Sequence, residues 1–186
     1  MIVKDEDLVY GLKIRDPGIS ELFFSRYGPM VFRLAMSVLG DEILASDCAQ
    51  DVLFKVLRSI QGFQGRSTLK TWIISITLNT ARTRLKREIK RNRRSRSLED
   101  IDLSSPAEGP EQYALRMERS DKVVRALRDL RPEYREILVL RETEELSYEE
   151  IAEILSIPIG TVRSRLARAR LALAEQFRKE FRNHEL

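Results

Sequence analysis

The sequence is nearly free of the residues that build disulfides, zinc sites and histidine-based catalysts. Its 186 residues include one cysteine, Cys48, and one histidine, His184. A single cysteine forms no intrachain disulfide and no cysteine-rich zinc site, and a lone histidine near the chain end argues against metal or acid–base chemistry. The sequence therefore predicts no catalytic residues, no metal ligands, no cofactor, no small-molecule substrate and no enzyme activity.

Long apolar segments are also absent. Every apolar run is far shorter than the roughly 20 residues that a membrane-spanning helix needs. The acidic residues Asp5, Glu6 and Asp7 directly follow the start, which does not fit a secretory signal. We therefore expect a cytoplasmic protein with no direct membrane insertion.

Charge is abundant and segregated. Charged residues make up 33% of the chain, and the formal net charge is +4. One stretch is almost wholly basic, opposed only by Glu88, and contains Arg82, Arg84, Lys86, Arg87, Lys90, Arg91, Arg93, Arg94 and Arg96. Like charges at helical spacing cost about 0.2–0.5 kcal/mol per pair, a cost that bound phosphate would relieve. The stretch indicates a nucleic-acid partner, although a solvated basic helix end is the alternative.

Apolar residues recur at helical spacing through most of the chain, which predicts an all-α fold. The expected helices cover residues 4–14, 20–39, about 41–60, residue 69 into the basic stretch, 111–130, a segment that restarts at Pro132, and two more from Ser147 onward. Ser20 is the expected N-cap of the second helix and Gly40 its expected end. Asp41 is expected to start the third helix. Residues 71–78 are rich in β-branched side chains and could form a strand. We expect a helix there, because Leu69, Trp72, Ile73 and Ile76 fit one helical face.

A change of composition at residues 97–110 marks a domain boundary. Serine, proline, glycine and acidic residues replace the arginines there, as is typical of a linker. We expect two small helical domains, 1–96 and 111–186, joined by a flexible linker. Fourteen residues reach at most roughly 45–50 Å, more than one turn of duplex DNA, which is about 34–36 Å. The two domains could therefore contact separate DNA sites.

Residues 146–173 carry the pattern of a helix-turn-helix. Ser147 and Glu150 form a capping box at the start of the first helix. Pro158 and Gly160 are expected to end that helix, and a basic second helix follows from about residue 159. Arginine and serine near the start of this second helix suit base edges in the major groove. The alternative is a surface helix with a solvated basic face.

Two further clusters are candidates for binding. Asp47 and Asp51 lie four residues apart on one predicted helix, which suits either a solvated acidic face or a docking site for a basic partner. Phe63 lies in a loop between two glycines. It could stack on an unpaired base or fold back onto the core, and the sequence leaves both alternatives open.

Taken together, three motifs resemble the bacterial sigma factors of the extracytoplasmic-function (ECF) group. They are SDCAQDVLFKV, GFQGRSTLKTWIISITLNTARTRLKR and LRPEYREILVLRETEELSYEEIAEILSIPIGTVRSRLARAR. The resemblance covers nearly the whole chain. It implies an all-α chain with two domains, called regions 2 and 4, and a role in promoter-specific initiation. It also implies core RNA polymerase, promoter DNA and a cognate anti-sigma factor as partners.

The resemblance assigns roles to single residues. Core polymerase binding falls to Asp47, Gln50 and Asp51. Capture and melting of the −10 element fall to Phe63, Gln64, Arg66, Asn79, Arg82 and Lys86. Contacts to the −35 element fall to Thr161, Arg163, Ser164, Arg165, Ala167 and Arg168. The chain departs from the family pattern at Leu53 and Phe54, which indicates repacking of the docking helix. The rival hypothesis is a stand-alone helix-turn-helix regulator.

Overall fold

The computed structural model describes residues 3–95, 127 and 129–182, and in these residues the chain forms helices and no strand. The expected linker and most of the expected helix at 111–130 lie outside the described residues. The elements are α1 (Asp5–Lys13), α2 (Pro17–Leu39), α3 (Glu42–Ser59), η1 (Ile60–Gly62), α4 (Leu69–Ser95), α6 (Pro132–Leu138), η2 (Val139–Thr143), α7 (Tyr148–Leu155) and α8 (Ile159–Arg182). The all-α prediction is confirmed.

Local signals set the ends of α2 and the start of α3. Gly40 ends α2 in the left-handed region at φ +69°, and the Asp41 side chain accepts a hydrogen bond from the Leu44 N–H at 2.8 Å. The expected cap at Ser20 is wrong. Asp16 caps α2 by accepting from the Ile19 N–H at 2.9 Å. Pro17 is the first helical residue, where its fixed φ and missing N–H suit a helix start.

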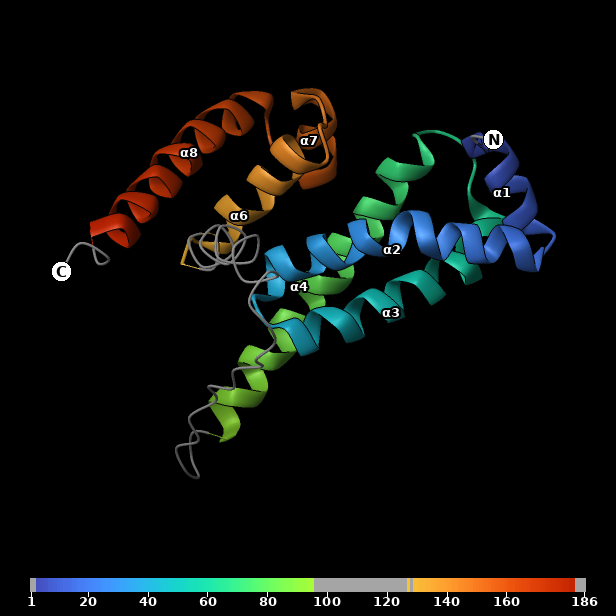
Figure 1. The fold of residues 1–186 in the computed structure, drawn as a ribbon, viewed down its shortest axis with the longest axis horizontal. Coiled ribbons are helices and arrows are strands. Elements are labelled where there is room, and N and C mark those ends of the chain that lie inside the picture. The colour runs from blue at the N-terminus through green and yellow to red at the C-terminus, as the bar shows by residue number, and fades with distance from the viewer. Residues whose placement is uncertain (1–2, 96–126, 128, 183–186) are drawn as a thin grey trace, which may run out of the picture.

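The ambiguous segment at residues 71–78 is helical, as predicted, and belongs to α4. Its buried surface is wider than the single expected face, because Ile74, Leu78 and Ala81 are also buried. The reason is that α2 and α3 both pack against α4 and against each other. These three helices form the core of the N-terminal half, and α1 covers one end of α2 (Figure 1).

In the C-terminal half, α6, η2, α7 and α8 surround a second group of buried residues, among them Ile137, Ile151 and Leu166. The element η2 is a single π-helical turn that the sequence did not predict. Gly160 does not end the first helix of the helix-turn-helix, since it lies inside α8. The helix ends instead at Ser156, which adopts left-handed backbone angles with φ +53°.

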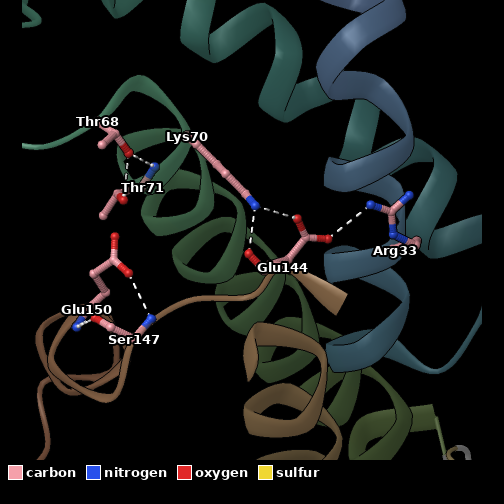
Figure 2. Close-up of polar contacts among 7 residues, drawn as sticks. All are labelled: Arg33, Thr68, Lys70, Thr71, Glu144, Ser147 and Glu150. Carbon is pink, nitrogen blue, oxygen red and sulfur yellow. Dashed lines mark hydrogen bonds and ion pairs between the residues drawn. The ribbon is translucent and has the colours of Figure 1, made fainter. Parts of the chain in front are cut away.

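The two halves pack against each other. Helix α2 contacts α6 and η2, and α4 contacts α7, so the buried residues of both halves belong to one core (Figure 1). Polar contacts add to this packing around Glu144 (Figure 2). None of the described helices combines the length and the apolar character needed to cross a bilayer.

Candidate protein and nucleic-acid interfaces

The acidic residues of α3 form an exposed surface that is braced from α4. The side chains of Asp47 and Asp51 are 62% and 60% exposed. Arg84 reaches over from α4, with 2.5 Å from Nη2 to Asp51 Oδ2 and 3.9 Å from Nη1 to Asp47 Oδ2. Gln50 is exposed on the same helix. The structure therefore brings the three predicted polymerase-binding residues together on one surface.

A shallow apolar hollow lies beside these carboxylates. It is lined by Phe24, Phe32, Ser46, Ala49, Gln50, Leu53 and Phe54. Phe54 is 46% exposed and lies edge-on to Phe24, with ring centroids 6.4 Å apart. Exposed aromatic rings next to charges are typical of protein-binding surfaces. Leu53 and Phe54, where the chain departs from the family pattern, both contribute to the apolar part of the α3 surface.

The Phe63 loop packs back on the core while its polar neighbours face solvent. The ring of Phe63 lies against Trp72 with centroids 5.0 Å apart, and its carbonyl oxygen accepts a hydrogen bond from Lys13 Nζ at 3.2 Å. Gln64 and Arg66 are exposed. A hollow between α1 and this loop is lined in part by Phe63 and Gln64. The loop thus offers an aromatic edge and two polar groups beside an open space.

The predicted −10 residues of α4 share one face. Asn79, Arg82 and Lys86 are spaced three and four residues apart, which places them on one side of a helix. Asn79 and Lys86 are exposed, whereas Arg82 is partly buried. From Trp72 to Lys86 the helix rises roughly 21 Å, so this face extends away from the Phe63 loop. The side chains of Arg93, Arg94 and Arg96 lie outside the described residues.

Arg82 is engaged by the C-terminal half. Its Nη2 donates to Glu136 Oε2 at 2.9 Å and also lies 2.9 Å from Oε1. Glu136 belongs to α6, 54 residues further along the chain. In this arrangement a predicted DNA-contacting cation is therefore bound to a carboxylate of its own chain.

The helix-turn-helix presents its predicted residues along the first turns of α8. The capping box of Ser147 and Glu150 is present and starts α7. Val162, Leu166 and Ala169 face the core, which leaves Arg163, Ala167 and Arg168 exposed. Thr161, Ser164 and Arg165 are partly buried.

Arg168 is held in place by the preceding turn of α8. Its Nε donates to the Ser164 carbonyl oxygen and its Nη2 to Ser164 Oγ, both at 3.3 Å. Ser164 Oγ in turn donates to the Thr161 carbonyl oxygen at 3.2 Å. A guanidinium oriented in this way suits bidentate contact with a base edge.

Sequence reasoning missed several residues that support these surfaces. Arg141 donates to the Leu146 carbonyl oxygen at 2.7 Å and lies over the Tyr148 ring, which fixes the chain before α7. Arg170 forms two hydrogen bonds to Glu142 Oε1, at 2.6 and 3.0 Å, and these bonds raise its pKa further. Arg170 lies in a run of arginines, and both Arg141 and Arg170 depend on partners whose positions follow from the packing, so their spacing alone did not reveal a bracing role.

Comparison with known proteins identifies the class that these two halves define. Family models described as "Sigma-70 region 2" and "Sigma-70, region 4" match residues 23–93 and 120–173. The RNA polymerase sigma-H factor of Pseudomonas aeruginosa is 33% identical over 180 residues, covering 91% of this chain and 92% of that protein. The ECF RNA polymerase sigma-E factor of Escherichia coli K12 is 33% identical over 181 residues, with the same coverage of both chains. The chain belongs to the sigma-70 family of RNA polymerase sigma factors, in its ECF group.

Solved structures agree with this assignment. The sigma factor RpoE of Bartonella quintana, in complex with the anti-sigma factor NepR, has a TM-score of 0.70 and 27% identity. The match covers 85% of this chain and 96% of RpoE. CnrH in complex with the cytosolic domain of CnrY has a TM-score of 0.64 at 22% identity, which is a likeness of fold.

Proposed function

We propose that this chain binds core RNA polymerase through α3 and directs it to promoters through two DNA surfaces. The Phe63 loop and the exposed face of α4 bind the −10 element. The start of α8 binds the −35 element as duplex DNA. The N-terminal domain then ends near residue 96 and the C-terminal domain starts near residue 111. The chain is a non-enzymatic subunit that gives RNA polymerase its promoter specificity. It acts in the cytoplasm, where the polymerase and the genome are located.

One observation carries this proposal: an acidic, partly apolar surface on α3 and a basic surface on α4 coexist with a helix-turn-helix in one chain. A stand-alone regulator has use for the helix-turn-helix but not for the α3 surface. It would also usually dimerise to read two half-sites. The family membership adds weight to the same conclusion.

Strand opening explains why a polymerase is needed. Extruding a base costs a few kcal/mol, and stacking on an aromatic side chain returns about 1–3 kcal/mol per base. A single ring such as Phe63 cannot offset the melting of several base pairs. A large partner that holds the DNA must contribute the rest, and the carboxylates of α3 give the chain a surface on which to dock it.

We further propose an anti-sigma protein as a regulatory partner. The related RpoE of Bartonella quintana is complexed with one. In this chain an apolar hollow of about 250 Å³ opens between α2 and the C-terminal half, with Phe32, Met36, Leu127 and Val139 among its lining residues. Apolar side chains of an amphipathic partner helix would fit such a hollow.

Site-specific photocrosslinking tests the proposed surfaces. A photoreactive amino acid replaces one exposed residue at a time: Gln50 on α3, Gln64 in the loop, Ala167 on α8, or Glu175 on α8 as the control. Each variant is assembled with purified core polymerase and promoter fragments selected from a library. We expect Gln50 to crosslink to polymerase, Gln64 to the −10 region and Ala167 to the −35 region, with little product from Glu175. Crosslinks from Gln50 to DNA, or from Ala167 to polymerase alone, would contradict the assignment.

A further inference from the structure

Two carboxylates of the C-terminal half point into the basic side of the N-terminal half. Glu136 lies on α6, and Glu144 directly follows η2. Both are almost fully buried, with 6% and 4% of their surface exposed. Buried carboxylates need cationic or hydrogen-bonding partners, because losing water around a charge is costly. In this chain the cationic partners of both come from the other half.

Glu144 gathers two cations from different helices (Figure 2). Arg33 on α2 donates from Nη2 to Oε1 at 3.0 Å. Lys70, in the first turn of α4, has its Nζ 3.4 Å from Oε2 and also donates to the Glu144 carbonyl oxygen at 2.7 Å. One residue thus ties the C-terminal half to α2 and α4 together.

Glu136 makes the second attachment, to Arg82. Lys70 and Arg82 are twelve residues apart on α4, which corresponds to roughly 18 Å along the helix. Two attachments this far apart fix both the distance and the angle between the halves. They act together with the packing of α2 on α6 and of α4 on α7.

Backbone hydrogen bonds around Glu144 fix its position next to the N-terminal half. The Glu144 N–H donates to the Val139 carbonyl oxygen at 3.0 Å and so closes the π-turn. The Leu146 N–H donates to the Leu140 carbonyl oxygen at 3.1 Å. Glu145 adopts left-handed angles with φ +58°, a conformation that costs energy for a residue other than glycine. The turn therefore holds Glu144 in a position that the relaxed chain would not favour.

The geometry points to an intramolecular lock in which Glu136 and Glu144 occupy basic groups of the N-terminal half in place of DNA phosphate. The closed chain excludes nucleic acid from Arg82, and the halves must separate before promoter DNA can bind there. This inference rests on the proposed −10 role of Arg82. The lock itself is a property of the free chain and can be measured without polymerase or promoter.

The charged part of the lock loses little on opening, whereas the packing of α2 on α6 holds the halves together through apolar contacts. When the halves separate, water reaches the two carboxylates and the three cations, so no charge is left buried without a partner. A polyanion competes directly for the freed cations, and partly exposed ion pairs weaken as salt rises. DNA and ionic strength are therefore both expected to favour the open chain.

The first part of the experiment measures the distance between the halves in the full-length chain. Ser25→Cys on α2 and Ala174→Cys on α8 replace exposed residues and carry nitroxide labels. Cys48 is fully buried and burial raises the pKa of its thiol, so it does not compete for the label. Pulsed dipolar spectroscopy compares the parent with Glu136→Gln/Glu144→Gln. The control is Glu133→Gln/Glu145→Gln, which removes the same charge from exposed neighbours.

We expect a narrow distance distribution in the parent and the control, and a broader, longer one in Glu136→Gln/Glu144→Gln. Circular dichroism checks that each variant is folded. Should Glu136→Gln/Glu144→Gln fail to fold, Arg33→Gln replaces it, because it breaks the Glu144 contact from the other half. A distribution identical to the parent in a folded lock variant would overturn the lock.

The second part measures DNA binding by anisotropy with a fluorescein-labelled single-stranded 20-mer of mixed sequence. If about one chain in ten is open, full opening tightens the apparent affinity about tenfold. The lock variant should therefore gain about three- to tenfold over the control, which corrects for the lost negative charge. If the halves separate in the lock variant but its affinity for the 20-mer does not rise, the proposal that the closed chain excludes DNA would be overturned. Failure of the polymerase crosslinks, with both of these results intact, would instead count against the proposed function alone.

Discussion

Arg84 on α4 pairs with Asp51 on α3, with 2.5 Å between Nη2 and Oδ2 across 33 residues of sequence. The pair fixes the position of the Asp51 carboxylate on the exposed surface of α3. Because the Asp51 side chain is largely exposed, the pair adds little to stability, typically below about 1 kcal/mol. Its consequence is the position of a negative charge on the surface that we assign to polymerase.

Asp51→Arg is therefore expected to weaken binding to core polymerase while the fold is kept. Reversing a charge at an interface lowers the association rate and adds repulsion against a basic partner. Binding is measured by surface-immobilised core polymerase, with Glu175→Arg on α8 as the matched control. The double variant Asp51→Arg/Arg84→Asp restores the internal ion pair and should still bind poorly. Wild-type affinity in Asp51→Arg would remove α3 from the docking surface.

Arg168→Ala should lower affinity for −35 duplex by about 1–3 kcal/mol, because a bidentate contact to a base edge is lost. Discrimination between −35 sequences should fall with it. Arg170→Ala is the control, since Arg170 is held by Glu142 and is expected to affect discrimination little. Holoenzyme binding to matched and mismatched −35 fragments measures both effects. Unchanged discrimination in Arg168→Ala would show that this side chain reads no base.

Ser147→Ala should lower the free energy of unfolding by about 0.5–2 kcal/mol, because it removes one side of the capping box at α7. Urea denaturation followed by circular dichroism gives the value. Ser25→Ala, at an exposed position inside α2, should be neutral or slightly stabilising. Equal effects of the two substitutions would mean that the cap does not stabilise the helix-turn-helix.

Tyr27 should lose its proton only at high pH. Burial, followed by the nearby Asp5 carboxylate, raises the pKa of Tyr27 from 10.0 to about 12. The folded chain thus holds this proton more tightly than the unfolded chain, so the stabilisation is complete below about pH 10 and is lost as pH rises towards 12. Absorbance at 295 nm follows the titration, and Tyr27→Phe should remove the late component. A late component that persists in Tyr27→Phe would assign it to another tyrosine.

Much of the fold could be predicted because its signals are local. Gly40, Asp41 and the pair Ser147 and Glu150 each act within a few residues of the helix end that they define. The Ser20 cap was wrong because two adjacent candidates, Asp16 and Pro17, supply both a side-chain acceptor and a fixed φ. Ser156 was missed because serine rarely adopts left-handed angles, and nothing in its neighbours indicates that it would.

The candidate surfaces were predictable only in part. Spacing alone places Asp47 and Asp51 on one helix face, but Arg84 joins them from 33 and 37 residues away. The partner of Arg82 is further still, and no sequence period links it to Glu136. Glu144 depends on an unpredicted π-turn. Contacts between distant segments depend on how the helices pack, which local patterns do not record.

Transcription in vitro tests the central claim most directly. Purified core polymerase is supplied with a promoter library, with and without this protein, and the transcript start sites are sequenced. We predict initiation at a defined class of promoters that depends on the protein and shares −10 and −35 sequences. No added initiation, together with tight DNA binding by the protein alone, would contradict the sigma-factor assignment and favour a stand-alone regulator.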